Sequence, residues 1–165
     1  MSKRRKLPEL GAIFLVPLRD GGFGIGVLAR ADGKGSAFGY FFGPRVSGPE
    51  EVQTDRLAPE LALLVGMFGD PEILRGNWPL IGEMEHRGLD SWPLPPLSRV
   101  DENAGRAWLS TYSDTLQCLS EKEIDLVEAS EYPYDRLMGA GAVEIRLTKL
   151  IKEAEAGREN QKAKR

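Results

Sequence analysis

The sequence predicts a β-rich α+β fold, in which a twisted, partly closed antiparallel sheet carries one or two short helices and a charged C-terminal tail. Three observations predict this class: short apolar or alternating runs recur along the chain, glycine-containing turn signals separate them, and no internal repeat interrupts them. With 165 residues, of which 41% are hydrophobic, the chain is long enough for one core. We expect a basic arm over residues 1–9, a single β-rich domain over 10–150, and a charged tail, helical or disordered, over 151–165.

The first hairpin is the most clearly predicted element. Residues 12–18 form an apolar run, and Asp20-Gly21 follows as a strong hairpin signal because glycine tolerates a positive φ. In the second strand, glycines at positions 22, 24 and 26 alternate with bulky residues, so a period of two puts these glycines on one face. We expect them to admit a neighbouring backbone or a large side chain. The residues that we interpret as structural in this hairpin are Pro17, Phe23, Gly24 and Gly26.

The same glycines loosely match the G-x-G-x-x-A fingerprint of dinucleotide-binding loops, over residues 24–29. That motif requires a helix to begin at its end, so that backbone N–H groups point at the phosphates. Here the turn-forming stretch of residues 30–36 follows instead. We therefore expect the chain to bind no nucleotide and no other cofactor.

The middle of the chain alternates between strands and turns. Residues 37–42 are rich in aromatic side chains and predict a third strand, residues 44–56 predict a loop, and residues 57–68 fit a helix or a buried strand equally well. Asp70 is a candidate N-cap with Pro71 at the first helical position. Residues 77–85 predict another strand. We expect Trp78 and Gly82 to be structural residues of this strand, and we expect the side chains of Trp78 and Ile81 to lie inside the core.

The last third of the chain predicts one more hairpin and a closing strand. Residues 106–113 and 115–120 surround a turn at Ser113-Asp114, and the acidic segment after them reads as short-helical or irregular. Alternating apolar side chains predict a strand over residues 139–151, which passes into a charged helix that Gly157 would end. The alternating residues are Val143, Ile145 and Leu147.

No set of residues with a catalytic spacing is present. The only cysteine, Cys118, excludes an intrachain disulfide, and we expect it to be a buried apolar residue. The only histidine, His86, lies near several carboxylates without the spacing of a metal site. We expect neither a metal nor a catalytic site, and hence no enzyme. A hydrolase that uses two convergent carboxylates stays open as an alternative.

The charges are distributed unevenly. Residues 10–148 carry 12 Lys and Arg against 21 Asp and Glu, a net charge of −9, whereas both ends of the chain are basic. A body with this charge repels nucleic acid and attracts basic partners. Residues 114–135 hold seven acids against one lysine, which predicts either a solvated acidic face or a docking surface with tyrosine anchors. The candidate partner-binding residues are Asp114, Glu121, Glu123, Asp125, Glu128, Glu131, Tyr132 and Tyr134.

We expect a cytoplasmic protein that contacts no membrane. Residues 1–18 imitate a secretory signal, but Pro17 breaks the apolar run and no small-residue cleavage site follows. No apolar run approaches the roughly 18 residues of a membrane-spanning helix. Because the chain ends are basic, a non-catalytic module that binds nucleic acid or a basic protein segment remains an alternative function.

Three segments resemble the immunity protein 26 family of bacterial polymorphic toxin systems. Residues 11–29, GAIFLVPLRDGGFGIGVLA, are similar to the family's opening strand, turn and glycine-bearing strand. Residues 76–85, GNWPLIGEME, resemble its R-W-P-x-I-G segment, with Gly76-Asn77 before the tryptophan, and residues 139–148, GAGAVEIRLT, resemble its closing strand. The resemblance implies a non-enzymatic protein that binds and neutralises a toxin domain, often a nuclease. An acidic inhibitor suits such a target, because a nuclease presents a basic surface to its substrate.

Overall fold

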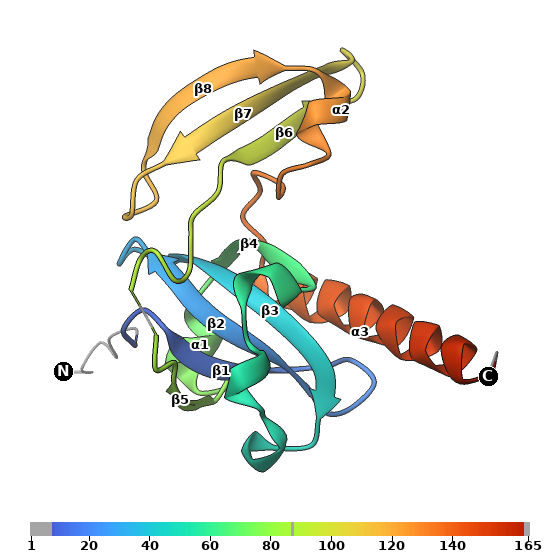
Figure 1. Ribbon diagram of the computed structural model, residues 1–165. Coiled ribbons are helices and arrows are strands. Elements are labelled where there is room, and N and C mark those ends of the chain that lie inside the picture. The colour runs from blue at the N-terminus through green and yellow to red at the C-terminus, as the bar shows by residue number, and fades with distance from the viewer. Residues whose placement is uncertain (1–7, 87, 164–165) are drawn as a thin grey trace.

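The computed structural model describes residues 8–86 and 88–163, with side chains described up to residue 159. It contains a five-stranded antiparallel sheet, a three-stranded antiparallel sheet and a long C-terminal helix (Figure 1). The five-stranded sheet has the order β4-β3-β2-β1-β5 and the other the order β6-β7-β8. The strands are β1 Ala12–Pro17, β2 Phe23–Ala31, β3 Ser36–Val46, β4 Leu64–Gly69, β5 Leu80–Glu83, β6 Leu97–Asp101, β7 Arg106–Tyr112 and β8 Cys118–Ile124.

The β-rich α+β class is confirmed, but the partly closed sheet is not found. The outer strands β4 and β5 do not pair with each other, and the strands from β6 to β8 form a sheet of their own. One face of the larger sheet is covered by helix α3, Ala140–Ala163, which contacts β2, β3 and β4. A helix therefore buries the face that sheet closure would otherwise have buried.

The expected strand over residues 139–151 is wrong, because this segment lies within α3. Val143, Leu147 and Ile151 are all at most 1% exposed and recur every four residues, which places them on the helix face toward the sheet. Ile145, which the strand pattern placed beside them, is 58% exposed and points away. Gly157 does not end the helix, which continues to Ala163. The charged segment up to Ala163 is therefore part of one long helix, and not a short helix that follows a strand.

The remaining helices are short. Helix α1, Pro71–Arg75, begins as predicted after Asp70, although the Asp70 side chain makes no capping hydrogen bond. Helix α2, Leu126–Ala129, follows β8. Three 3-10 turns occupy part of the expected loop and of the ambiguous segment after it, before β4. These turns are η1 Pro49–Glu51, η2 Thr54–Arg56 and η3 Pro59–Leu61.

The core lies on both faces of the five-stranded sheet. On the α3 side, buried aromatic rings from β1, β3, β4 and the segment before β5 pack together, and the ring of Trp78 stacks on that of Phe14 at 5.8 Å. Trp78 Nε1 also donates to Glu144 Oε2 on α3 at 2.9 Å, which ties the segment before β5 to the helix. The other face buries Ile25, Val27 and their neighbours beneath the loops around Trp92.

The shared face is confirmed for Gly24 and Gly26, whereas Gly22 lies in the turn before β2 with a φ of 71° and faces Arg45. A Cβ on Gly24 would lie 2.4 Å from Leu147 Cδ2 of α3, and one on Gly26 would lie 2.2 Å from the Phe14 ring. Both positions therefore face the helix side, and side chains of α3 and β1 fill the space that they leave. The strand continues to Ala31, so no helix begins at the glycines as a dinucleotide loop requires.

Candidate partner-binding surface

Helix α2 covers one face of the three-stranded sheet. The other face, which we call the open face, is exposed at Arg99 but buried at its Leu97 and Ser110 end. On the covered face, Ala107 and Leu109 of β7 are buried, and Ser98 Oγ of β6 donates to the carbonyl oxygen of Ala129 in α2 at 2.9 Å. Helix α2 therefore packs on this side. The strand register puts Arg99 opposite Trp108 and Trp108 opposite Glu123, and these three side chains share the other face.

Trp108 lies between two arginines on the open face. The Arg99 and Arg106 guanidinium carbons lie 4.5 and 5.1 Å from the centre of its ring. Each guanidinium is also paired with a carboxylate of β8: Arg99 with Glu121 at 3.3 Å, and Arg106 with Glu123 at 2.8 Å. The hydrogen bond from Arg106 lowers the pKa of Glu123. The negative charges of Glu121 and Glu123 are thus largely compensated locally.

The acids on the α2 side are arranged differently. The Asp125 carboxylate accepts a hydrogen bond from the Glu128 backbone N–H at 2.8 Å and so caps α2. The side chains of Glu128 and Glu131 form no ion pair within the described part of the chain. Exposed apolar side chains lie on and near the same helix: Leu126 is 46% exposed and Val127 79%.

Asp114 has a partner inside the molecule. It lies in the β7–β8 turn, and its Oδ1 accepts a hydrogen bond from Arg30 Nε at 2.9 Å. Arg30, on β2, is 4% exposed, and its Nη1 donates to the carbonyl oxygens of Ala29 and Trp92, both at 2.7 Å. This ion pair joins the two sheets, so Asp114 acts as an internal clamp.

The two candidate tyrosines also differ. Tyr134 is 63% exposed and lies beside β6, where its backbone forms a bridge with Ser98. Tyr132 is half-buried. Tyr112, which we did not single out, donates a hydrogen bond to Asp135 Oδ1 at 2.6 Å, and burial is the first cause of the raised pKa of its hydroxyl.

The predicted docking residues therefore do not converge on one face. Glu121 and Glu123 lie on the open face of the small sheet, Glu128 and Glu131 lie with α2 on the other side, and Asp114 is held by β2. We did not predict a role for Trp108 or its flanking arginines. The register of the β7–β8 hairpin could have predicted this arrangement, because two-residue alternation places Trp108 and Glu123 on the same face once the turn is located.

The residues that we interpreted as structural have definite places. Pro17 pairs with Phe23 at the end of the first hairpin, Trp78 is buried, and Gly82 pairs with Ile13 on the exposed strand β5. Cys118, expected to be buried, is exposed at the start of edge strand β8. Its position on β8, whose residues are nearly all exposed, explains the difference.

Among residues 8–86 and 88–163, no three His, Cys, Asp or Glu side chains are grouped so that they could hold a metal ion. In the same described ranges, no helix is both long enough and apolar enough to cross a membrane. Helix α3 has the length, but charged residues recur along it.

Comparison with known families gives the class of this protein: it is an immunity protein of toxin systems. The chain belongs to the immunity protein 26 family, whose model matches residues 9–109. No curated protein and no solved structure matches the chain. Members of this family are non-enzymatic inhibitors, so the chain neutralises a cognate toxin and is not an enzyme.

The family match confirms the resemblance of the front and middle segments, which both lie within residues 9–109. The third segment lies outside the matched residues and forms the start of α3 rather than a closing strand. The candidate docking residues, from Asp114 to Tyr134, also lie beyond the match.

Proposed function

We propose that this immunity protein neutralises a nuclease toxin by stoichiometric, largely electrostatic docking, and that its α2 surface makes the contact. The α2 surface consists of Leu126, Val127, Glu128, Glu131 and Tyr134. The observation that carries the proposal is the combination of two carboxylates without an ion pair in the described chain and three exposed apolar or aromatic side chains. Charges without a partner steer the association of the two proteins, and burial of exposed apolar side chains in the interface contributes favourably to the free energy of binding.

The charge of the whole body supports a basic target. Residues 10–148 carry a net charge of −9, so the long-range field favours a partner with a positive surface. A nuclease has such a surface because it must bind a phosphate backbone. A toxin of this kind would be met in the cytoplasm, where we propose that the protein acts.

The open face of the small sheet supports electrostatic docking less well. Glu121 and Glu123 are exposed, but each is held by an arginine of the same sheet. A basic partner would have to compete with these arginines for the carboxylates. We therefore assign the steering role to Glu128 and Glu131 and a smaller role to Glu121 and Glu123.

The first experiment identifies the toxin. The C-terminal domain of the large reading frame beside this gene is expressed with and without the immunity protein, and growth and nucleic-acid cleavage are measured. We expect that domain to stop growth and degrade nucleic acid, and we expect co-expression to restore growth through a 1:1 complex. Neutralisation of a toxin that leaves nucleic acid intact would contradict the nuclease proposal while leaving the immunity function in place.

The second experiment tests the α2 surface. The change Glu128→Lys with Glu131→Lys should weaken toxin binding by about 30-fold or more, mainly through slower association. The control Glu50→Lys with Glu85→Lys makes the same change of charge at two exposed positions far along the chain and should change the affinity by less than about threefold. Equal effects of the two variants would mean that net charge, rather than the α2 surface, decides binding.

A further inference from the structure

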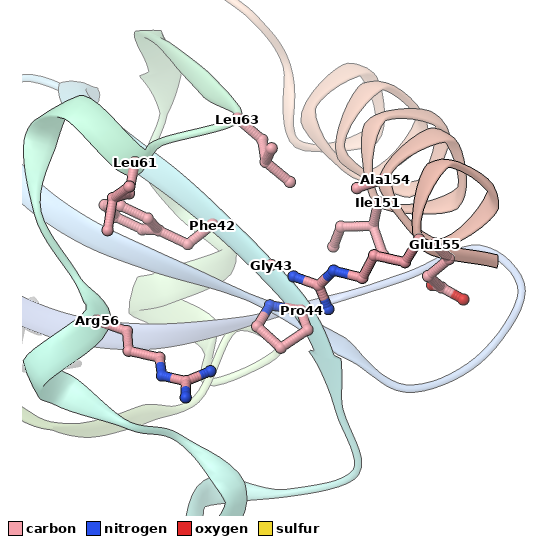
Figure 2. Close-up of a pocket in the computed structure, with 10 residues that line it drawn as sticks. Phe42, Gly43, Pro44, Arg56, Leu61, Leu63, Ile151, Ala154 and Glu155 are labelled. Carbon is pink, nitrogen blue, oxygen red and sulfur yellow. The ribbon is translucent and has the colours of Figure 1, made fainter. Parts of the chain in front are cut away.

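A small apolar pocket opens between the end of β3, the segment from η2 to the start of β4, and helix α3. Figure 2 shows Leu61 and Arg56 on one side, Ile151, Ala154 and Glu155 of α3 on the other, and Gly43 and Pro44 of β3 between them. Its volume is about 200 Å³. Its apolar lining residues are Phe42, Pro44, Leu61, Leu63, Ile151 and Ala154.

Gly43 contributes to the shape of the pocket. A Cβ at this position would lie 3.3 Å from both Ile151 Cγ1 and Leu63 Cδ1, so a larger residue would crowd the space between the helix and the start of β4. Leu61 is 57% exposed, which leaves a large apolar side chain at the mouth of the pocket without a cover. The pocket is therefore open and its apolar lining meets solvent.

The rim of the pocket is positively charged. Three charged residues lie on it: Arg56, Glu155 and Arg158. Arg45 holds Glu155 in an ion pair at 3.1 Å, and Arg45 is also bound to Asp20. Within residues 8–86 and 88–159, Arg56 and Arg158 have no ion-pair partner. Two uncompensated guanidinium groups thus flank an apolar hole.

We propose that this pocket receives one apolar side chain of the cognate toxin, Phe or Leu, with a toxin carboxylate beside it at Arg56 and Arg158. This inference rests on the proposed function, because it assumes that the partner is a toxin. The volume suits one side chain: a dry cavity of roughly 150 Å³ holds a benzene molecule, while pockets for cofactors and drug-sized ligands begin near 300 Å³. A buried anchor surrounded by a polar rim is the usual form of an interface hot spot.

Filling the pocket tests the proposal. Ala154 lines the pocket. Ala156 lies two residues further along α3, is exposed, and faces the opposite side of the helix. Ala154→Trp should weaken binding of the purified toxin by about 30-fold or more, whereas Ala156→Trp should change it by less than about threefold. Thermal unfolding midpoints show whether both variants fold. If both fold and bind equally well, the toxin does not use the pocket.

A peptide titration tests the chemistry independently of the toxin. The probes are acetyl-Asp-Phe-amide and acetyl-Lys-Phe-amide, and the readout is the amide NMR shifts of Gly43, Leu63 and Ala154. We expect saturable shifts with the acidic peptide and at least about threefold weaker binding of the basic one. Arg56→Gln with Arg158→Gln should abolish the difference. No saturation, or equal affinity for the two peptides, would overturn the proposed chemistry of the pocket.

The two tests separate the possible failures. If the wild-type protein neutralises no toxin, the proposed function fails, and the peptides still decide what the pocket accepts. If the wild-type protein protects and Ala154→Trp protects equally well, the immunity function stands and the assignment of the pocket to the toxin is wrong.

Discussion

Gly26 shows how closely single residues are packed in the first hairpin. Its hydrogen atoms face the buried Phe14 ring, which in turn stacks on Trp78. The Phe14 ring cannot move aside to make room for a methyl group on residue 26, because it is fixed among other aromatic rings. Gly82 on β5 offers a comparison, since nothing lies within 4 Å of a Cβ built on it and its φ is not positive.

We predict that Gly26→Ala lowers the free energy of unfolding by about 2–3 kcal/mol, because the added methyl group overpacks the core. Gly82→Ala serves as the control and should change it by at most about 0.5 kcal/mol. Urea unfolding followed by tryptophan fluorescence measures both. Equal effects would mean that Phe14 can move aside and that the close approach is not a constraint.

Residue-scale roles were only partly predictable. The alternation of glycines along β2 predicted that they would admit a large neighbour, and the structure identifies Phe14 and Leu147 as those neighbours. The role of Asp114 was not predictable, because its partner Arg30 is distant in the sequence and is brought close only by the placement of one sheet on the other.

At the scale of elements, the Arg30–Asp114 pair is a specific link between the two sheets. Arg30 is buried, whereas the Asp114 side chain is 61% exposed, so solvent weakens the Coulombic part of the interaction. Removal of the carboxylate nevertheless leaves a buried guanidinium with only carbonyl partners.

We therefore predict that Asp114→Ala lowers the free energy of unfolding by about 1–2 kcal/mol. The control Asp55→Ala removes an exposed carboxylate from η2 and should change it by less than about 0.5 kcal/mol. Denaturant unfolding gives both values. If the two variants are equally stable, the carbonyl oxygens alone satisfy Arg30 and the clamp contributes nothing.

Helix α3 is the element that the sequence pattern described least well. Alternation of Val143, Ile145 and Leu147 fits a strand, and the helical spacing of Val143, Leu147 and Ile151 fits a helix, so a short window allows both. The sheet decides between them, because its α3 side is already lined by buried aromatic rings and accepts one apolar helix face.

The continuity of α3 through Gly157 gives a further prediction. Gly157 has no positive φ, and nothing lies within 4 Å of a Cβ built on it. Gly157→Ala should therefore raise the helical signal in far-UV circular dichroism and stabilise the helix by about 0.5–1 kcal/mol. A left-handed glycine that ended the helix would give the opposite result, since alanine is strained there.

At the scale of the whole molecule, two surfaces are proposed for one toxin. The α2 surface is acidic and partly apolar, and the pocket beside α3 is apolar with a basic rim. If both take part, variants of the two surfaces should lower the affinity independently, because they share no contacts. If one set of variants has no effect, the other surface is the docking face.

Electrostatic steering predicts a salt dependence of the association rate. Raising the salt concentration from about 0.05 to 0.5 M should slow association of the wild-type protein with its toxin by about tenfold, with a much smaller effect on dissociation. Glu128→Lys with Glu131→Lys should reduce this dependence, while the Glu50 and Glu85 variant should retain it. Stopped-flow fluorescence measures both rates. An association rate that is independent of salt would contradict electrostatic docking.

The sequence by itself determined the β-rich class, the first hairpin with its glycine face, the short helix after Asp70 and a hairpin that turns after Tyr112, since each depends on contacts between near neighbours in the chain. The second strand of that later hairpin was misplaced, because it lies at Cys118–Ile124 and not at residues 115–120. It also carried the motifs of the immunity family. Only the tertiary structure decided that residues 140–163 form one helix, that the acids of residues 114–135 are divided between two sides of a sheet, and that Asp114 is paired with Arg30. These features depend on which distant surfaces meet, and neither local periodicity nor the count of charges contains that information.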